Sequence, residues 1–367
     1  MPRVVIAAGG TAGHVVPALA VADALRARGA EVEFAGGERA EAELVPAAGY
    51  PFHRLEVRGL DRGNPLRAAR ALLIAARASG KAIRLLRRIR PDAVLGGGGY
   101  VAGPVGLAAG ALRIPLVLTE ADSHLGVTNR LLAPLARRVF LAFPIPGREG
   151  GKYEVAGRPL PPPSSTDAGH DSLGSSARAR ARERFGLPAE GPCLLVFGGS
   201  LGARRLNDAA LEAFGAAAPC LVLHASGRRD HPDLRRRLDE LGAPAHYRLE
   251  PYIEPFSDAL ACADLAVARA GGSVLELAAA GLPAVLVPYP HASADHQTAN
   301  ARHMERAGAA VVVPDAELDG PRLAREVGEL LGDERRLGEM AAAARSAARP
   351  DAAGRIADEL LRLSARE

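Results

Sequence analysis

Two glycine-rich turns carry residue types that could bind and activate a substrate. One reads GGTAGH at 9–14 and the other GGSLG at 198–202, and each lies between a short apolar run and a helical pattern. In an α/β fold such a turn lies at the carboxyl edge of a parallel sheet, where ligands bind. Glycines let a ligand approach the backbone, and the next helix offers N–H groups and a positive dipole end to an anion. The repetition predicts two similar halves facing each other across a cleft.

A further turn, RAGGS at 269–273, begins a helix that carries Glu276. A helix N-terminus with two glycines and a serine suits a diphosphate, because its N–H groups are free and its dipole is favourable. A carboxylate one turn later can accept hydrogen bonds from both hydroxyls of a ribose. The alternative is that Ser273 and Glu276 cap their own helix in the S-x-x-E pattern.

Uncharged polar side chains follow a predicted strand end near 288. The segment PYPH at 288–291 leads into DHQTAN at 295–300, which contains His296, Gln297 and Asn300. These side chains can exchange hydrogen bonds without net charge, which suits a polyhydroxylated ligand. The alternative is the ordinary polar start of a helix.

Length and composition limit the class of protein. A chain of 367 residues with 48% hydrophobic and 24% charged residues predicts a soluble globular protein of two domains. Its three cysteines lie in apolar runs, which indicates buried thiols in a reducing compartment and no metal site. The N-terminal apolar run is too short for a signal peptide, so we expect none, and no apolar run approaches the roughly 20 residues that span a bilayer. A net charge of +4 does not favour nucleic acid as a partner.

The segment 66–90 is strongly basic. It contains eight arginines and lysines, no acidic residue, and leucines and isoleucines between them. Such a segment could lie on an anionic membrane surface. The alternative is a helix that covers a sheet and turns its basic face to solvent.

Apolar runs that alternate with helical patterns predict a doubly wound parallel sheet in each half. We expect a Rossmann-like domain at 1–156, a linker and mobile loop at 157–184 because proline, serine and glycine are frequent there, and a second Rossmann-like domain at 185–345. A C-terminal helix at 346–367 could pack back on the first domain. The expected strands are 4–8, 31–35, 93–95, 116–119, 139–142, 154–156, 194–197, 221–224, 246–249, 265–268, 284–287 and 310–313.

The motifs together resemble the MurG family of glycosyltransferases, in order and spacing, from the N-terminus to about residue 315. The motifs are GGTAGH at 9–14, GGGGYVAGP at 96–104, GGSLGARRLN at 198–207, RAGGS…E at 269–276, AAAGLPAVLVPYPH at 278–291 and DHQTANA at 295–301. The resemblance implies a GT-B fold of two Rossmann-like domains across a cleft. It also implies an inverting enzyme of peptidoglycan synthesis that needs neither metal nor cofactor.

The implied reaction moves N-acetylglucosamine from UDP-GlcNAc to the C4 hydroxyl of the N-acetylmuramoyl-pentapeptide of lipid I, giving lipid II and UDP. The enzyme would be peripheral on the cytoplasmic side of the cell membrane, with the basic segment 66–90 on anionic headgroups. Proteins of cell-wall synthesis or division are implied as further partners. The family, and not the charge of the segment, supplies the membrane link.

Carried over by position, the resemblance implies a role for each motif residue. On the donor side, Ile253 would hold the uracil, Glu276 the ribose, Ser200, Gly272 and Ser273 the diphosphate, and His296 and Gln297 the GlcNAc hydroxyls. On the acceptor side, Thr11, Ala12, Gly13 and His14 would lie near the reacting centre, and Gly97, Gly98, Gly99 and Tyr100 would meet the lipid diphosphate through their backbone N–H groups.

His14 is the expected general base. Imidazole titrates near neutrality, and a helix N-terminus favours its neutral, proton-accepting form. The alternative is a histidine that only orients a phosphate or packs in the turn. Glu120 and Asp122 are the reserve candidates for the base.

The chain departs from the family pattern in three places. It has Glu120-Ala121-Asp122 where the family usually has Glu-Gln-Asn, so an acid replaces an amide near the sugar. It has GRPLP at 157–161 where the family has Gly-Asn-Pro-Val-Arg, and Arg158 could supply the missing cation. The segment 269–276 is one residue shorter than usual.

Other functions remain open from the sequence. One is another GT-B enzyme that uses a UDP-sugar, such as a transferase acting on diacylglycerol or a non-hydrolysing UDP-GlcNAc 2-epimerase. Another is a UDP-sugar-binding protein without catalysis. The absence of G-x-G-x-x-G disfavours a nicotinamide dehydrogenase.

Overall fold

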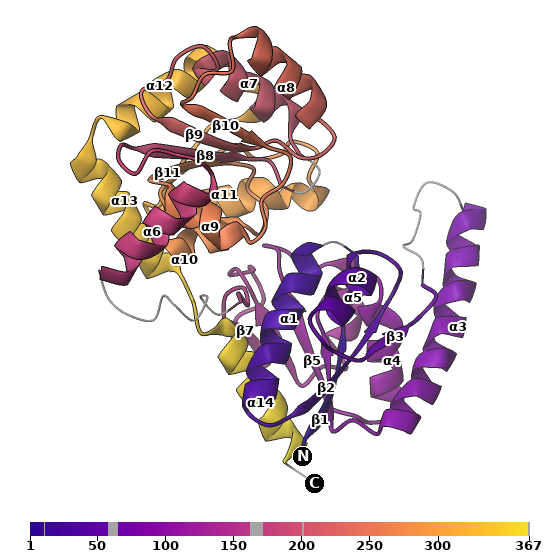
Figure 1. The fold of residues 1–367 in the computed structure, drawn as a ribbon. Helices are drawn as coiled ribbons and strands as arrows, with labels where there is room; N and C mark the ends of the chain where they lie inside the picture. Colours follow the sequence, from indigo (N-terminus) through magenta and orange to yellow (C-terminus); the bar gives the residue numbers. More distant parts are fainter. Residues whose placement is uncertain (11, 58–64, 162–171, 200–201, 366–367) are drawn as a thin grey trace. The chain divides into compact units, whose positions relative to one another are not determined.

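The computed structural model describes residues 1–10, 12–57, 65–161, 172–199 and 202–365 (Figure 1). The chain divides into two compact units. One comprises Met1–Pro161 with Arg349–Glu367, and the other comprises Pro162–Ala348. Within the described residues, no helix is long and apolar enough to cross a bilayer.

The first unit is built on a parallel sheet of seven described strands, in the order β3-β2-β1-β4-β5-β6-β7. Both of its faces are covered by helices, so its central strands are continuous apolar runs. The strands are β1 (Arg3–Ala7), β2 (Glu31–Gly36), β3 (Phe52–Arg54), β4 (Ala93–Gly96), β5 (Leu116–Glu120), β6 (Arg138–Leu141) and β7 (Tyr153–Val155). The helices are α1 (Ala12–Ala27), α2 (Ala40–Ala47), α3 (Pro65–Ile89), α4 (Ala102–Ala111), α5 (Val127–Leu132) and α14 (Ala352–Ser364).

Alternate residues of β1 serve two separate cores. Val4 and Ile6 pack in a cluster with α1 and α14, whereas Val5 packs in a cluster with α3 and α4. This follows from the period of two residues along a strand. Figure 1 shows α14, from the end of the chain, beside α1. The last helix therefore completes the hydrophobic core of the first unit.

The second unit has a parallel sheet of six described strands, in the order β10-β9-β8-β11-β12-β13. The strands are β8 (Cys193–Phe197), β9 (Leu221–Ala225), β10 (Tyr247–Glu250), β11 (Leu265–Ala268), β12 (Ala284–Leu286) and β13 (Ala310–Val312). The helices are α6 (Ser172–Arg184), α7 (Arg204–Phe214), α8 (His231–Glu240), α9 (Phe256–Cys262), α10 (Val274–Ala280), α11 (His296–Arg306), α12 (Gly320–Leu331) and α13 (Glu334–Ala347), with short 3-10 turns η1 (Ser293–Asp295) and η2 (Asp315–Glu317).

The strand order reverses direction at β1 in the first sheet and at β8 in the second. β1 pairs with β2 and β4, and β8 pairs with β9 and β11. Ligands of doubly wound folds bind at the carboxyl ends of strands at such a point. The predicted α/β class is confirmed, and the glycine-rich turns that begin at Gly9 and Gly198 follow these two strands.

The structure differs from the sequence expectation in two elements. β3 was not expected, because Phe52–Arg54 is a short edge strand with little apolar character. The helix α6 occupies 172–184, within the segment expected to be linker. Arg182 in this helix is 1% exposed and donates hydrogen bonds to the carbonyls of Pro188, Ala189 and Gly191. Arg182 also donates to the distant Cys262 carbonyl at 3.5 Å, and this tertiary contact leaves no mark in local composition.

Candidate functional site

In the first unit, the turn after β1 packs directly against the turn after β4. Gly98 and Gly99 have φ values of +91° and +78°. A Cβ on Gly99 would lie 1.9 Å from the Gly9 carbonyl oxygen, and one on Gly98 would lie 2.6 Å from Cδ2 of His14. These glycines therefore allow the two turns to touch.

The glycine run at 97–99 differs in one respect from the expected anion cradle. The N–H of Gly97 donates a hydrogen bond to the Ala7 carbonyl at 2.9 Å. It is therefore not available to a phosphate, which corrects the expectation for this residue. The sequence could not reveal this, because the acceptor lies on another strand.

His14 lies in the first turn of α1 and is half-buried. Its Nδ1 is buried and has no hydrogen-bond partner among the described residues. Burial lowers the pKa of His14, Arg158 lowers it further, and Asp122 and Glu41 raise it to a lesser extent than burial lowers it. The net direction is downward, so the imidazole is neutral at neutral pH and can accept a proton.

Arg158 and Asp122 lie beside this turn although they follow different strands. The guanidinium of Arg158 is 7% exposed and donates to the Gly13 carbonyl at 3.1 Å. Asp122 follows β5, and its charge acts on His14. The structure therefore gathers Gly13, His14, Asp122 and Arg158 at one edge of the first sheet.

Glu120, a reserve candidate for the general base, has its carboxylate occupied by hydrogen bonds from the loop and helix that follow it. Its carboxylate accepts hydrogen bonds from the N–H of Gly126 at 2.8 Å, from Nδ2 of Asn129 at 2.9 Å and from the N–H of Asp122 at 3.3 Å. Burial raises its pKa. Both oxygens brace the loop that follows β5, and this arrangement favours a structural role over proton transfer.

In the second unit, Ile253 and Glu276 lie at the carboxyl edge of the sheet. Ile253 is buried beside Tyr252, which is 40% exposed and lies under the guanidinium of Arg228. Burial raises the pKa of Tyr252, and the charge of Glu276 adds to this shift. The loop after β10 and the helix α10 therefore bring an aromatic ring, a buried apolar side chain and a carboxylate together.

Ser273 and Gly272 precede α10 as expected. The alternative that Ser273 caps the helix does not hold, because its side chain makes no capping hydrogen bond. The first turn is closed instead by backbone bonds such as Glu276 N–H to the Ser273 carbonyl at 3.0 Å. The serine hydroxyl is therefore not committed to the helix start.

Buried side chains tie the surrounding loops together. Arg269 is 8% exposed, pairs with Asp315 at 2.6 Å, and donates to the carbonyls of Val287 and Pro288 at 3.2 Å. Asn300 is fully buried and donates to the Ala270 carbonyl at 3.1 Å. Asn300, which seemed suited to a ligand, is thus a structural residue. The sequence reasoning also missed Arg269 and Asp315; an arginine directly before a glycine turn was the available signal.

His296 and Gln297 begin α11. Nδ1 of His296 lies 2.8 Å from the Ser293 carbonyl, so this nitrogen donates a hydrogen bond. The amide oxygen of Gln297 accepts from the N–H of Tyr289 at 2.9 Å. These bonds orient both side chains at the strand ends of the second sheet.

Two predicted site residues, Thr11 and Ser200, lie outside the described residues, and α1 begins at Ala12. Over the part of the chain that the structure describes, no group of three or more histidine, cysteine, aspartate or glutamate side chains is arranged to hold a metal.

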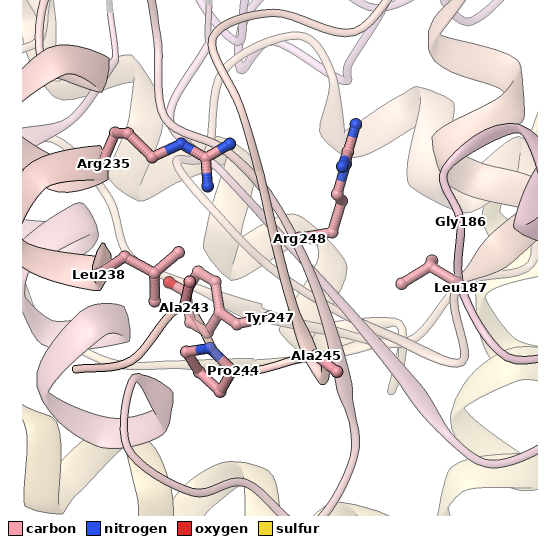
Figure 2. A pocket seen from close by; sticks show the side chains of 9 residues that line it. All are labelled: Gly186, Leu187, Arg235, Leu238, Ala243, Pro244, Ala245, Tyr247 and Arg248. Carbon is pink, nitrogen blue, oxygen red and sulfur yellow. The ribbon is translucent and has the colours of Figure 1, made fainter. Parts of the chain in front are cut away.

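Figure 2 shows a pocket of about 260 Å³ in the second unit. It lies at the amino end of β10, which is the opposite end of that strand from Ile253. Arg235 and Arg248, which line it, have carboxylate neighbours in Asp239 at 3.9 Å and Glu250 at 2.6 Å. The full lining is Gly186, Leu187, Arg235, Leu238, Ala243, Pro244, Ala245, Tyr247 and Arg248.

Comparisons with known proteins decide the family. The model of the glycosyltransferase family 28 N-terminal domain matches residues 4–141, and that of the family 28 C-terminal domain matches 193–356. A relative from Methylococcus capsulatus is 44% identical over 360 residues, which cover 97% of each chain. One from Alkalilimnicola ehrlichii is 46% identical over 362 residues, which cover 96% of this chain and 97% of the relative. The chain belongs to the MurG branch of glycosyltransferase family 28.

Both relatives are named UDP-N-acetylglucosamine–N-acetylmuramyl-(pentapeptide) pyrophosphoryl-undecaprenol N-acetylglucosamine transferase. The crystal structure of Acinetobacter baumannii MurG is 31% identical to this family 28 protein, with a TM-score of 0.76 over 99% of this chain and 100% of that chain. The predicted family and the GT-B class of two Rossmann-like domains are confirmed. The calicheamicin glycosyltransferase CalG4, 20% identical with a TM-score of 0.67, shares the fold alone.

Proposed function

We propose that this chain transfers GlcNAc from UDP-GlcNAc to the C4 hydroxyl of lipid I, undecaprenyl-diphospho-N-acetylmuramoyl-pentapeptide, and releases lipid II and UDP. The observation that carries the proposal is the identity of 41–46% over nearly the full chain to relatives named for this transfer. The polar residues at the carboxyl edges of both sheets support it.

The second unit holds the donor in this proposal. The backbone beside Ile253 binds the uracil, and the Glu276 carboxylate accepts hydrogen bonds from the ribose hydroxyls. Gly272 and Ser273, with Ser200, hold the diphosphate. His296 and Gln297, whose orientations are set by Ser293 and Tyr289, bind the sugar hydroxyls.

The first unit supplies the general base. Neutral His14 takes the proton of the acceptor hydroxyl as its oxygen attacks C1 of GlcNAc. The bond between C1 and the diphosphate oxygen breaks, UDP leaves with the electron pair, and the configuration at C1 inverts. Gly13, Asp122 and Arg158 line the acceptor side near this base, and Gly98, Gly99 and Tyr100 lie toward the lipid diphosphate.

The membrane face, in this proposal, includes α3 and its neighbours. The described part of α3 buries Leu85, Leu86 and Ile89 against the sheet and exposes Arg84 and Arg87. Neighbouring α4 and the α5 region expose Leu107, Leu131 and Leu135 by 50%, 68% and 46%. Basic side chains and exposed leucines on adjacent helices suit the surface of an anionic membrane. In this proposal the enzyme is a peripheral protein on the cytoplasmic side of the cell membrane, with this face against the lipid headgroups.

The test is transfer of labelled GlcNAc to a short-chain lipid I analogue, in the presence of a chelator, for wild type and His14→Ala. We expect turnover by wild type and a loss of about 100- to 10,000-fold in the variant, the usual contribution of a general base. Diacylglycerol as acceptor is the control. Transfer to diacylglycerol alone, epimerisation of UDP-GlcNAc, or binding of UDP-GlcNAc without turnover would each refute the proposal.

A further inference from the structure

Glu41 is a fully buried carboxylate that the proposed mechanism does not use. It lies in the first turn of α2 and is 0% exposed. Its Oε2 accepts a hydrogen bond from the N–H of Gly10 at 2.9 Å, and its Oε1 accepts one from the N–H of Gly37 at 2.9 Å. Gly10 belongs to the turn after β1, and Gly37 follows β2, so one carboxylate joins two strand ends.

The surrounding glycines leave room for this carboxylate. A Cβ on Gly9 would lie 2.8 Å from Oε1 of Glu41, and one on Gly37 would lie 2.9 Å from the same atom. A Cβ on Gly36 would lie 2.8 Å from its Cγ. A buried charge is tolerated only where hydrogen bonds compensate for its lost hydration, and two backbone N–H groups do so here.

The turn that carries His14 is therefore held from two sides. Glu41 binds the amide of Gly10, which has a φ of +114°. On another side, Gly99 packs against the Gly9 carbonyl and Gly98 packs against the His14 ring. Gly10 and His14 lie only four residues apart, and Gly99 and Gly98 pack against Gly9 and His14 respectively, so we expect a shift of the Gly10 amide to change the position of the His14 ring.

We propose that Glu41 is a positioning residue for this turn. Its carboxylate anchors Gly10 and so sets the position and orientation of His14, without itself contacting substrate. The catalytic consequence rests on the proposed function, whereas the anchoring of the turn does not.

Glu41→Gln is the variant that tests this role, because it keeps the size of the side chain but replaces one accepting oxygen by an NH₂ group that cannot accept. Glu43→Gln, on the exposed side of the same helix, is the matched control. We expect kcat to fall about 10- to 100-fold in Glu41→Gln, which corresponds to the loss of one charged hydrogen bond. KM for UDP-GlcNAc should stay within twofold, because the donor residues belong to the second unit.

The second readout is the NMR titration of the His14 ring, which needs no substrate. The charge of Glu41 acts to raise the pKa of His14. The titration midpoint should therefore move to lower pH in Glu41→Gln and not in Glu43→Gln. An unchanged midpoint together with an unchanged kcat would overturn the proposal, and so would a kcat loss matched by equal loss of donor binding, since that pattern indicates general unfolding.

A measurement on wild type covers the case in which Glu41→Gln does not fold. The amides of Gly10 and Gly37 should exchange with solvent as slowly as those of the β1 core, because a buried carboxylate holds both. Fast exchange at both glycines would overturn the anchoring. If wild type fails to use lipid I but the exchange result holds, the reaction assignment is wrong and the anchoring of the turn by Glu41 stands.

Discussion

At the scale of single residues, charges of both signs act on the pKa of His14, the proposed base. Burial and Arg158 lower its pKa, and Asp122 and Glu41 raise it. Asp122 stands where the family usually has an amide, so this chain has a charge that opposes the effect of burial. The protonation of the base should therefore respond in opposite directions to changes at Asp122 and Arg158.

This gives a prediction for the pH dependence of kcat/KM. The acidic limb in wild type should lie below the ordinary histidine pKa of 6.5. Asp122→Asn should move that limb to lower pH, because a group that raises the pKa is lost, and Arg158→Gln should move it to higher pH. Rates measured between pH 5 and 8 decide this. Shifts in the same direction for both variants would exclude His14 as the titrating group.

His224 provides a prediction for stability. It is fully buried, its Nδ1 lies 2.7 Å from the Tyr247 hydroxyl and its Nε2 lies 3.0 Å from Oδ1 of Asn207. Burial lowers its pKa to about 3. In the unfolded chain this histidine takes up a proton near pH 6.5, whereas in the folded chain it stays neutral until the pH is near 3. Its contribution to stability is therefore complete above pH 6.5 and is lost as pH falls toward 3.

Between pH 7 and pH 5 the free energy of unfolding should therefore fall by about 2 kcal/mol through this histidine. Urea unfolding of wild type and His224→Gln, followed at both pH values, measures it. The glutamine variant is less stable overall, but its loss between the two pH values should be smaller. Equal losses in both proteins would contradict the assignment.

At the scale of elements, α3 has two different faces. Its described apolar side chains belong to the core of the first unit, as an ordinary sheet-covering helix requires. On the opposite face, Arg84 and Arg87 are exposed to solvent, and Arg88 lies 3.4 Å from Nδ1 of His53. The two interpretations of the basic segment 66–90 are therefore compatible.

Binding to vesicles tests the exposed face of α3. We expect Arg84→Gln with Arg87→Gln to weaken binding to vesicles rich in anionic lipid by about 2 kcal/mol, roughly 30-fold, at low salt. Arg325→Gln with Arg336→Gln, two exposed arginines of the second unit, is the charge-matched control. Neutral vesicles should not distinguish the proteins. Equal binding of both double variants to anionic vesicles would refute a membrane role for this face.

At the scale of the whole molecule, the chain returns to its first unit after completing the second. Ile356 and Leu360 of α14 are 0% exposed and lie in the core that contains Val4, Ile6 and Leu25. Arg28 of the first unit also pairs with Asp358 of α14 at 2.7 Å. The stability of the first unit therefore depends on residues at the far end of the sequence.

Ile356→Ala should destabilise the first unit by about 2–5 kcal/mol, because it leaves a cavity in a close-packed core. Asp358→Asn, on the exposed side of α14, is the control and should change stability little, because its ion pair with Arg28 is exposed to solvent. Hydrogen exchange, read separately for β1 and β8, measures the effect. Loss of protection at β8 as large as that at β1 would contradict the division into two units.

The sequence by itself determined the two parallel-sheet domains, the position of most strands and the glycine turns after β1, β8 and β11. These features depend on local apolar runs and on glycines close to them in the chain. Tertiary structure alone decided that Glu120 braces a loop, that the Gly97 amide is taken by Ala7, that Arg269 pairs with Asp315 and that Glu41 anchors Gly10. The physical reason is that hydrogen bonding and burial depend on which distant strand ends meet, and that is fixed only when each sheet is assembled.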